Sequence, residues 1–222
     1  MSSISPNTSI KDALSTPRIG TYQLATTAIP NLDGALALYS WNAQVSAALM
    51  APLHICEVVV RNAVADAIEA VYGPRWPWET VFEHSLPSPA PGHGYNPRRD
   101  LVATRQKETT TGKVIPELKF VFWQKMFTGR HDARLWNNHL HTVMPYLNTT
   151  MTVQQLRKMI HDELEQLRGL RNRIAHHEPI FKRNLASDFQ KAQALIALRC
   201  PHTAAWMHAN QQATQLIGVK PP

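Results

Sequence analysis

The sequence is poor in the residues that would form a disulfide framework or a thiolate zinc cluster. Cys56 and Cys200 are the only cysteines among 222 residues. Two cysteines cannot provide either structure, so we expect a reducing compartment and a cytoplasmic location. The opening segment also has no apolar core of the length that a signal peptide needs, which agrees with that expectation.

Glycine and long apolar runs are scarce as well. The nine glycines form neither a phosphate-cradling loop nor the Gly-x-Ser-x-Gly turn of many hydrolases. No stretch reaches the roughly 18 uninterrupted apolar residues typical of a spanning helix, so no membrane partner is expected. The remaining classes are a helical enzyme, a nucleic-acid binder and an interaction module.

Basic residues are in excess. The chain has 23 Lys and Arg against 16 Asp and Glu, a formal net charge of +7. Residues 98–134 hold nine of the basic residues and four acids, 9 − 4 = +5. Such a segment is usually an ordinary solvated face, but it could also attract a polyanion such as RNA to a nearby site.

Apolar residues recur at helical spacing through most of the chain, and no alternating pattern indicates a strand. The fold class that follows is all-α, a helical bundle. The pattern predicts helices over 32–50, over 52–72 with Pro52 in its first turn, over 116–127 with Pro116 at its start, over 132–143, from 153 into His176 and His177, and over 186–199. Thr152 and Gln155 predict a capping box at the start of the fifth of these helices.

The chain divides into three parts by composition. Residues 1–30, rich in Ser, Thr and Pro, are expected to form a loosely ordered arm. Residues 31–200 form the helical domain, and residues 201–222 a C-terminal tail or short helix. Within the domain, residues 73–97 hold six prolines and predict a long Pro-rich loop.

One segment differs from the rest of the chain, because it places two guanidinium groups, an amide and two imidazoles at the end of an amphipathic helix. Arg171 is expected on or beside the apolar stripe, where a charge is costly unless it is paired. Asn172 and His176 share one face of the helix, and Arg173 and His177 share another. Arg171 and His176 are about 140° apart on an ideal helix. They could act on one phosphate only through long side-chain reach, a frayed last turn or a second subunit, which favours a homodimer.

Residues of these types can cleave RNA without a metal. A neutral imidazole can take the proton of a 2′-hydroxyl, because its ordinary pKa lies near working pH. Arginine can stabilise the charge that develops on the phosphorane oxygens. Attack by the 2′-oxygen would leave a 2′,3′-cyclic phosphate and a 5′-hydroxyl, so the expected substrate is RNA.

The string Arg171-Asn172-x-x-x-His176 resembles the Arg-Asn-x-x-x-His motif of HEPN-domain ribonucleases. With its flanks, from Leu170 to Ile180, it is similar to the Abi-like (abortive-infection) branch of that superfamily. Other strings also resemble that branch: Tyr39-x-Trp41-Asn42, Glu57-x-x-x-Arg61-Asn62, Tyr72-Gly73-x-x-Trp76 and Phe122-Trp123. The resemblance covers about residues 32–200, most of the chain.

The resemblance implies an HEPN-like helical bundle that dimerises across its motif helices and cleaves or binds RNA in phage defence or toxin systems, where an antitoxin partner restrains it. It implies no cofactor. By the resemblance, Arg171 and His176 take the catalytic positions and Asn172 the orienting one. The supporting positions are Arg173, His177, Glu57, Arg61 and Asn62.

Other interpretations of these residues stay open. Glu57 and Arg61 lie four apart on an apolar helix and predict an internal ion pair, and Arg171 could pair with Glu57. His176 could simply cap a helix end, where the helix dipole favours imidazole. His176 and His177 point apart, so no metal site is expected. The leading hypothesis is a metal-independent endoribonuclease; the others are a non-catalytic HEPN module that binds RNA, a nucleotide or a partner, and a scaffold whose motif serves packing.

Overall fold

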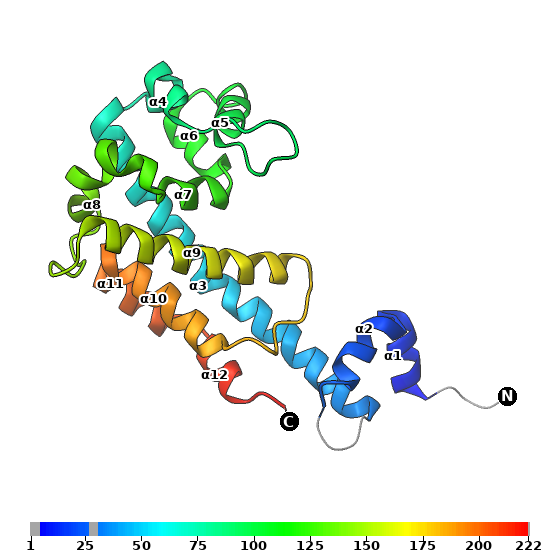
Figure 1. Cartoon of the computed structure of the whole chain (residues 1–222). Coiled ribbons are helices and arrows are strands. Elements are labelled where there is room, and N and C mark those ends of the chain that lie inside the picture. Colours follow the sequence, from blue (N-terminus) through cyan, green and yellow to red (C-terminus); the bar gives the residue numbers. More distant parts are fainter. Residues whose placement is uncertain (1–4, 27–30, 222) are drawn as a thin grey trace.

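A 41-residue helix, α3 (Leu32–Tyr72), forms the axis of the molecule (Figure 1). The computed structural model describes residues 5–26 and 31–221, and these residues form helices and no strand. The side chain of Asn31 caps the start of α3 by accepting a hydrogen bond from the Gly34 amide. Gly73 ends the helix at φ 80°, a conformation that glycine adopts without strain. The all-α class is confirmed for the described residues.

The predicted break at Pro52 is wrong, because α3 continues through it. A proline inside a helix removes one backbone hydrogen bond and costs about 3 kcal/mol. Apolar side chains on both sides of Pro52, among them Leu49, Leu53 and Cys56, are buried in the same core. Each fully buried aliphatic side chain contributes roughly 2 kcal/mol, so burial of the two halves in line offsets the cost.

By length and composition α3 is also long and apolar enough to cross a membrane. The search for uninterrupted apolar stretches in the sequence did not indicate this. The core helix of a protein that never enters a membrane meets the same criterion. Fifteen residues of α3 are buried within the molecule. The match therefore carries no membrane assignment.

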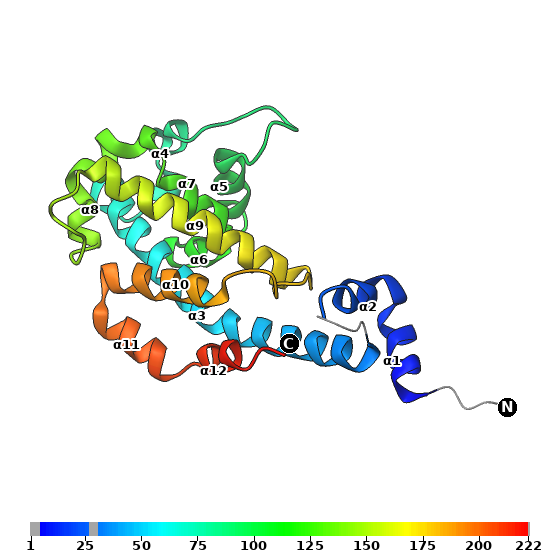
Figure 2. The same cartoon turned by 60° about the horizontal axis from the view of Figure 1, so that its bottom comes forward.

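Two amphipathic helices pack beside α3, and both were predicted. Helix α9 (Val153–Ala175) begins with the capping box of Thr152 and Gln155. It buries one stripe of residues: Leu156, Ile160, Leu164, Leu167, Leu170 and Ile174. Helix α10 (Leu185–Arg199) packs against α3 and α9. Figure 2 shows these three helices from a second direction.

Short helices between α3 and α9 form a lobe at the C-terminal end of α3 (Figure 1). They are η1 (Trp76–Trp78), α4 (Thr80–Ser85), α5 (Pro97–Arg105), α6 (Thr111–Glu117), α7 (Phe120–Met126), η2 (Gly129–His131), η3 (Asp132–Trp136) and α8 (Asn137–Val143). Trp76, Trp123 and Trp136 fill its core. The helix predicted over 132–143 is present, with a π-helical first turn.

The prediction for residues 73–97 is partly wrong, since η1 and α4 occupy much of the segment and leave 86–96 without helix. Arg98 closes this shorter loop by donating hydrogen bonds to the carbonyls of His84 (2.9 Å) and Leu86 (2.8 Å). Trp76 and Phe82 are buried and meet edge to face, which explains why helices form around the prolines.

The helix predicted to start at Pro116 is divided in the structure. Pro116 lies in the last turn of α6, and α7 begins at Phe120. Between them Leu118 has an extended backbone and a side chain only 2% exposed. Burial of Leu118 in the core thus breaks the helical pattern that runs through residues 116–127.

The prediction of a loosely ordered arm over 1–30 is wrong for its described part. Residues 6–23 form α1 (Pro6–Leu14) and α2 (Thr16–Gln23), whereas 1–4 and 27–30 lie outside the described residues. Ile19 and Tyr22 are buried, and the Tyr22 ring packs 5.1 Å from the rings of Tyr39 and Phe181. These two apolar anchors hold an otherwise polar segment on α3.

The C-terminal segment contains two short helices, α11 (Pro201–Ala209) and α12 (Ala213–Gly218), where a tail or short helix was expected. Residue 222 lies outside the described residues. Trp41 on α3 donates from Nε1 to the Leu216 carbonyl at 2.7 Å. This bond fixes α12 against the N-terminal half of α3.

A buried histidine makes the stability of the fold depend on pH. His131 is 3% exposed, and burial, with Arg130 and Arg134 nearby, lowers its pKa from 6.5 to about 4. The folded chain therefore disfavours the protonated form, which the unfolded chain adopts below about pH 6.5. The stabilising effect is complete above pH 6.5 and is lost as the pH falls toward 4.

We expect the free energy of unfolding to fall by up to roughly 3 kcal/mol between pH 7 and pH 4 through this group alone. Urea unfolding at several pH values measures it. His131→Gln should flatten the dependence, while exposed His141→Gln on α8 should leave it unchanged. Equal pH dependence in all three proteins would contradict the assignment.

Candidate functional site

The motif helix ends in a Schellman motif whose turning residue is a histidine. His176 is the C-cap, the amide of His177 donates to the Ile174 carbonyl (3.0 Å), and that of Glu178 donates to the Arg173 carbonyl (2.8 Å). His177 has φ 55°, in the left-handed region that usually requires glycine. The chain thus turns sharply at His177, one residue after the predicted catalytic histidine.

Four side chains from four parts of the fold hold the loop after this turn. Arg18 donates to the His177 carbonyl (2.8 Å), and Arg173 donates from Nη2 to the Pro179 carbonyl (2.8 Å). Lys220 donates from Nζ to the Phe181 carbonyl (2.9 Å). The fourth contact is internal: the side-chain oxygen of Asn42 accepts a hydrogen bond from the Ile180 amide at 2.8 Å. We refer to residues 176–181 as the motif loop.

Arg171 and Asn172 line a cavity of about 380 Å³ beside α9. Arg168, also on α9, lines it as well. The remaining wall is made by α3 and by the segment around the junction of α6 and α7: Glu57, Pro116, Glu117, Leu118, Lys119, Phe120 and Val121. We call this cavity the motif cavity. The structure thus brings three of the predicted residues, Arg171, Asn172 and Glu57, to one place.

Arg171 is exposed, which corrects the expectation that it lies on the apolar side of α9. The buried stripe passes through Leu170 and Ile174, so the guanidinium faces solvent and the cavity. Among the described residues it forms no ion pair, with Glu57 or with any other acid. No acid in the described part of the chain therefore compensates its charge.

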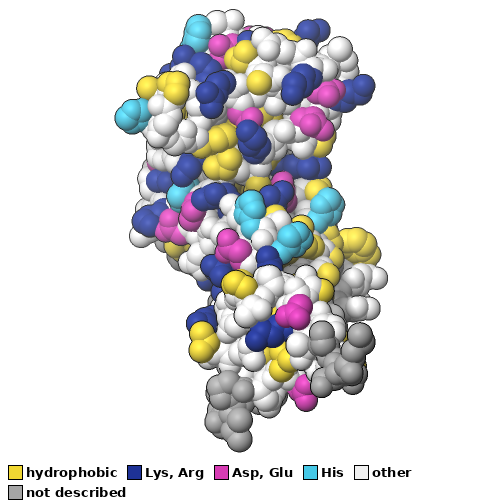
Figure 3. All heavy atoms as spheres, turned by 90° about the vertical axis from the view of Figure 1, so that its right-hand side faces the viewer, with side chains coloured by type: hydrophobic (Ala, Val, Ile, Leu, Met, Phe, Trp, Pro, Cys, Tyr) yellow, Lys and Arg dark blue, Asp and Glu magenta, His cyan; other side chains and the backbone are white. Residues whose placement is uncertain are grey.

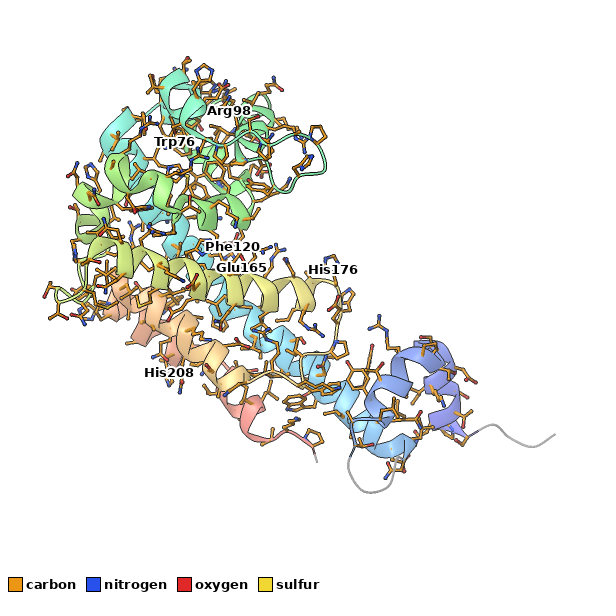
Figure 4. The ribbon with its side chains drawn as sticks, viewed as in Figure 1. Trp76, Arg98, Phe120, Glu165, His176 and His208 are labelled. Carbon is orange, nitrogen blue, oxygen red and sulfur yellow. The ribbon has the colours of Figure 1, made fainter. Side chains whose placement is uncertain are left out.

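His176 is exposed at the free end of α9 and is not part of the wall of the motif cavity. Figure 4 shows it there, and shows Phe120 and Glu165 where α7 and α9 approach each other. His176 follows Asn172 by one turn on the same face and is about 140° from Arg171. One chain therefore presents the two predicted catalytic side chains in neighbouring but separate places.

The predicted supporting residues have different roles. Arg173 is used by the motif loop and also lies 3.4 Å from Glu178. Asn62 is exposed on α3 and does not line the motif cavity. The predicted ion pair between Glu57 and Arg61 does not form in the described part of the chain, and the Nε atom of Arg61 is buried without a hydrogen-bond partner. Glu57 instead faces the cavity.

Sequence reasoning missed Arg168, Lys119 and Glu117 in the cavity wall. Arg168 lies three and four residues before Arg171 and Asn172, so helical spacing was a signal that could have found it. Lys119 and Glu117 come from the junction of α6 and α7, which was predicted to be helical and carried no such signal. With them the wall holds three basic side chains and two acidic ones.

A partly buried polar contact holds Arg168, one of the residues that line the cavity. Gln124, fully buried, donates from its side-chain nitrogen to Glu165, which also pairs with Arg168. Burial raises the pKa of Glu165, but the hydrogen bonds from Gln124 and Arg168 outweigh it and hold the pKa below its ordinary value. Glu165 therefore stays ionised and fixes Arg168 at the edge of the cavity.

The basic segment 98–134 contributes less free charge than its composition indicates. Arg98 is bound to backbone carbonyls, and Arg105 pairs with Glu83 at 2.5 Å and donates to the Pro77 carbonyl. Lys119 lies 3.3 Å from Asp100 but is 68% exposed. Figure 3 shows Lys and Arg side chains spread over the face at the free end of α9, with several His side chains gathered near its middle.

The described residues contain no cluster of three His, Cys, Asp or Glu side chains arranged to hold a metal ion. His176 and His177 do not form such a group. The independence from metals stays a prediction.

Comparisons of the chain with protein-family models, with curated proteins and with solved structures give no match. The likeness to Abi-like HEPN proteins therefore rests on the motifs alone.

The turn at His177 can be tested by giving it the residue that its backbone prefers. His177→Gly removes the steric strain of φ 55° and should stabilise the chain by about 1 kcal/mol, measured by urea unfolding. His176→Gly is the matched control, because His176 has φ −92° and gains nothing from glycine. A lower stability for His177→Gly than for wild type would show that the turn is not a source of strain.

Proposed function

We propose that the protein is a metal-independent endoribonuclease that acts as a homodimer. The observation that carries the proposal is the exposure of Arg171, which has no ion-pair partner among the described residues, on the wall of a polar cavity. His176 is exposed five residues further along the chain. Substitution of an exposed arginine without an ion pair is expected to cost little stability.

The chemistry assigns one task to each residue. Imidazole as a chemical group titrates near neutral pH, so His176 could take the proton of the attacking 2′-hydroxyl. Arg171 would bind the phosphate and stabilise the charge on its oxygens, and Arg168 would add a second cation. Asn172, between them on the helix, would orient the phosphate through its amide.

The separation of the two groups supports the homodimer. His176 is not in the cavity wall of its own chain, and the helical angle to Arg171 is wide. Two motif helices that pack across a two-fold axis would place His176 of one subunit near Arg171 of the other. A phage-defence or toxin role, and an antitoxin partner, are part of the proposal through the motif resemblance.

The test is cleavage of a labelled RNA in EDTA by the wild type and by Arg171→Ala and His176→Ala, with the products analysed for 2′,3′-cyclic phosphate. We expect each variant to lose on the order of a hundredfold or more in kcat, since each removes one group that acts in the transition state. His141→Ala, an exposed histidine on α8, is the matched control and should cleave like the wild type. Equal cleavage by all four proteins, or loss of activity in EDTA, would contradict the proposal.

A mixing experiment tests the shared site. If each site combines His176 of one subunit with Arg171 of the other, heterodimers of the two inactive variants contain one intact site. Mixing them under conditions of subunit exchange should restore up to about a quarter of wild-type activity, because half of the dimers are mixed and each has one of two sites. If subunit exchange is demonstrated and no activity returns, His176 and Arg171 of the same chain form each site.

A second candidate is a non-catalytic module that binds RNA or a nucleotide. The motif cavity favours it, since Arg168, Arg171 and Lys119 line the cavity and His176 does not. This function predicts binding that weakens with salt and no cyclic-phosphate product. Arg171→Ala would then weaken binding, and His176→Ala would leave it unchanged.

A further inference from the structure

The string Tyr39-x-Trp41-Asn42 has no part in the chemistry described so far, yet it meets the motif directly. Asn42 accepts a hydrogen bond from the Ile180 amide, 138 residues further along the chain. Ile180 belongs to the string that follows the motif histidine. One hydrogen bond therefore joins the early string on α3 to the end of the motif loop.

This hydrogen bond differs from the other three that hold the loop. Asn42 is 6% exposed and Ile180 is 0% exposed, so water cannot replace either partner. Arg18 and Lys220 are exposed, and the side chain of Arg173 is 44% exposed, so their bonds to carbonyls can exchange with water. Loss of the Asn42 acceptor would leave a backbone amide buried and unpaired.

Two fixed points follow His176 along the chain. Directly after it, the Schellman hydrogen bonds attach His177 and Glu178 to the last turn of α9. Two residues further on, Asn42 fixes Ile180, four residues after His176. His177 keeps a conformation that its side chain disfavours, and such a conformation persists only where the surroundings enforce it.

We propose that Asn42 is a positioning residue: by holding Ile180 it keeps the turn at His177 in place and so directs the His176 imidazole. The assignment rests on the proposed ribonuclease function for its kinetic consequence. Its structural consequence, a motif loop ordered by the Asn42 side chain, does not depend on that function. Asn42 acts only through the loop, since it does not line the motif cavity.

The experiment compares Asn42→Leu, which removes the acceptor, with Asn42→Asp, which keeps an oxygen in its place. Trp41→Phe is the matched control. Trp41 is the neighbouring residue, is also 6% exposed, and donates a partly buried hydrogen bond of similar length to the Leu216 carbonyl. Its ring centroid lies 5.9 Å from the Nζ atom of Lys220, and phenylalanine keeps an aromatic ring at that position. Where Asn42→Leu does not fold, Asn42→Ser replaces it.

For RNA cleavage, Asn42→Leu should lower kcat on the order of tenfold to a hundredfold with KM unchanged, as expected for a misplaced catalytic group. Asn42→Asp should recover most of that loss. Trp41→Phe should lower the melting temperature by about as much as Asn42→Leu does, and it should keep the wild-type kcat. Equal kcat for Asn42→Leu and Trp41→Phe would overturn the proposal.

Two measurements on the folded chain separate this inference from the ribonuclease function. Hydrogen exchange of the Ile180 amide should accelerate in Asn42→Leu alone, and the NMR signals of the His176 ring should shift or broaden in that variant. If the wild type cleaves no RNA, the proposed function fails and these two measurements still decide the positioning role. Unchanged Ile180 exchange in Asn42→Leu would refute it.

Discussion

Burial along α3 is the constraint on which the other elements depend. Helices α2, α9, α10 and α12 all pack against this helix, as does the lobe formed by α4 to α8. None of them is long and apolar enough to form a core without it. The same burial carries α3 through Pro52, since a break there would separate two halves that share one core. The site inherits this arrangement, because α3 supplies Glu57 to the motif cavity and Asn42 to the motif loop.

Much of the fold could be predicted from local signals. The capping box at Thr152, the apolar stripe of α9 and the span of α10 each depend on residues within one helix, and all three are present. The errors occur where distant contacts override a local preference. Local preference places a helix start at Pro52, but the residues on both sides of it are buried in one core, so the helix continues. Leu118 interrupts a helical pattern because its side chain is buried in the core. The composition of residues 6–23 is polar and predicts no fixed structure. In the folded chain Ile19 and Tyr22 are buried, and the Tyr22 ring packs against Phe181.

The candidate site shows the same division. The types and order of Arg171, Asn172 and His176 were visible in the sequence, as was the angle between them. The exposure of these side chains was not visible in the sequence. A small rotation of the helix about its axis decides whether a position beside the apolar stripe faces the core or the solvent. The turn at His177 could not be predicted, because the position with positive φ holds a histidine and not a glycine. Arg168 was within reach of helical spacing, whereas Lys119 enters the cavity only because the chain breaks at Leu118.

Basic side chains at the motif loop bind backbone carbonyls. Around the motif loop, Arg18, Arg173 and Lys220 each bind a carbonyl. A carboxylate would neutralise such a cation, but a carbonyl is uncharged and leaves the positive charge in place. Arg18 and Lys220 therefore keep their charges at fixed positions on the loop, whereas Arg173 shares its charge with Glu178, 3.4 Å away. Since salt screens exposed charges beyond about 10 Å at 0.1 M, the cations at the loop and at the motif cavity would act on a bound phosphate more strongly than basic residues farther away. Lys119 is the member of segment 98–134 that lines the cavity. Local cations, more than the net charge of the whole chain, would then attract the RNA that the proposed function requires.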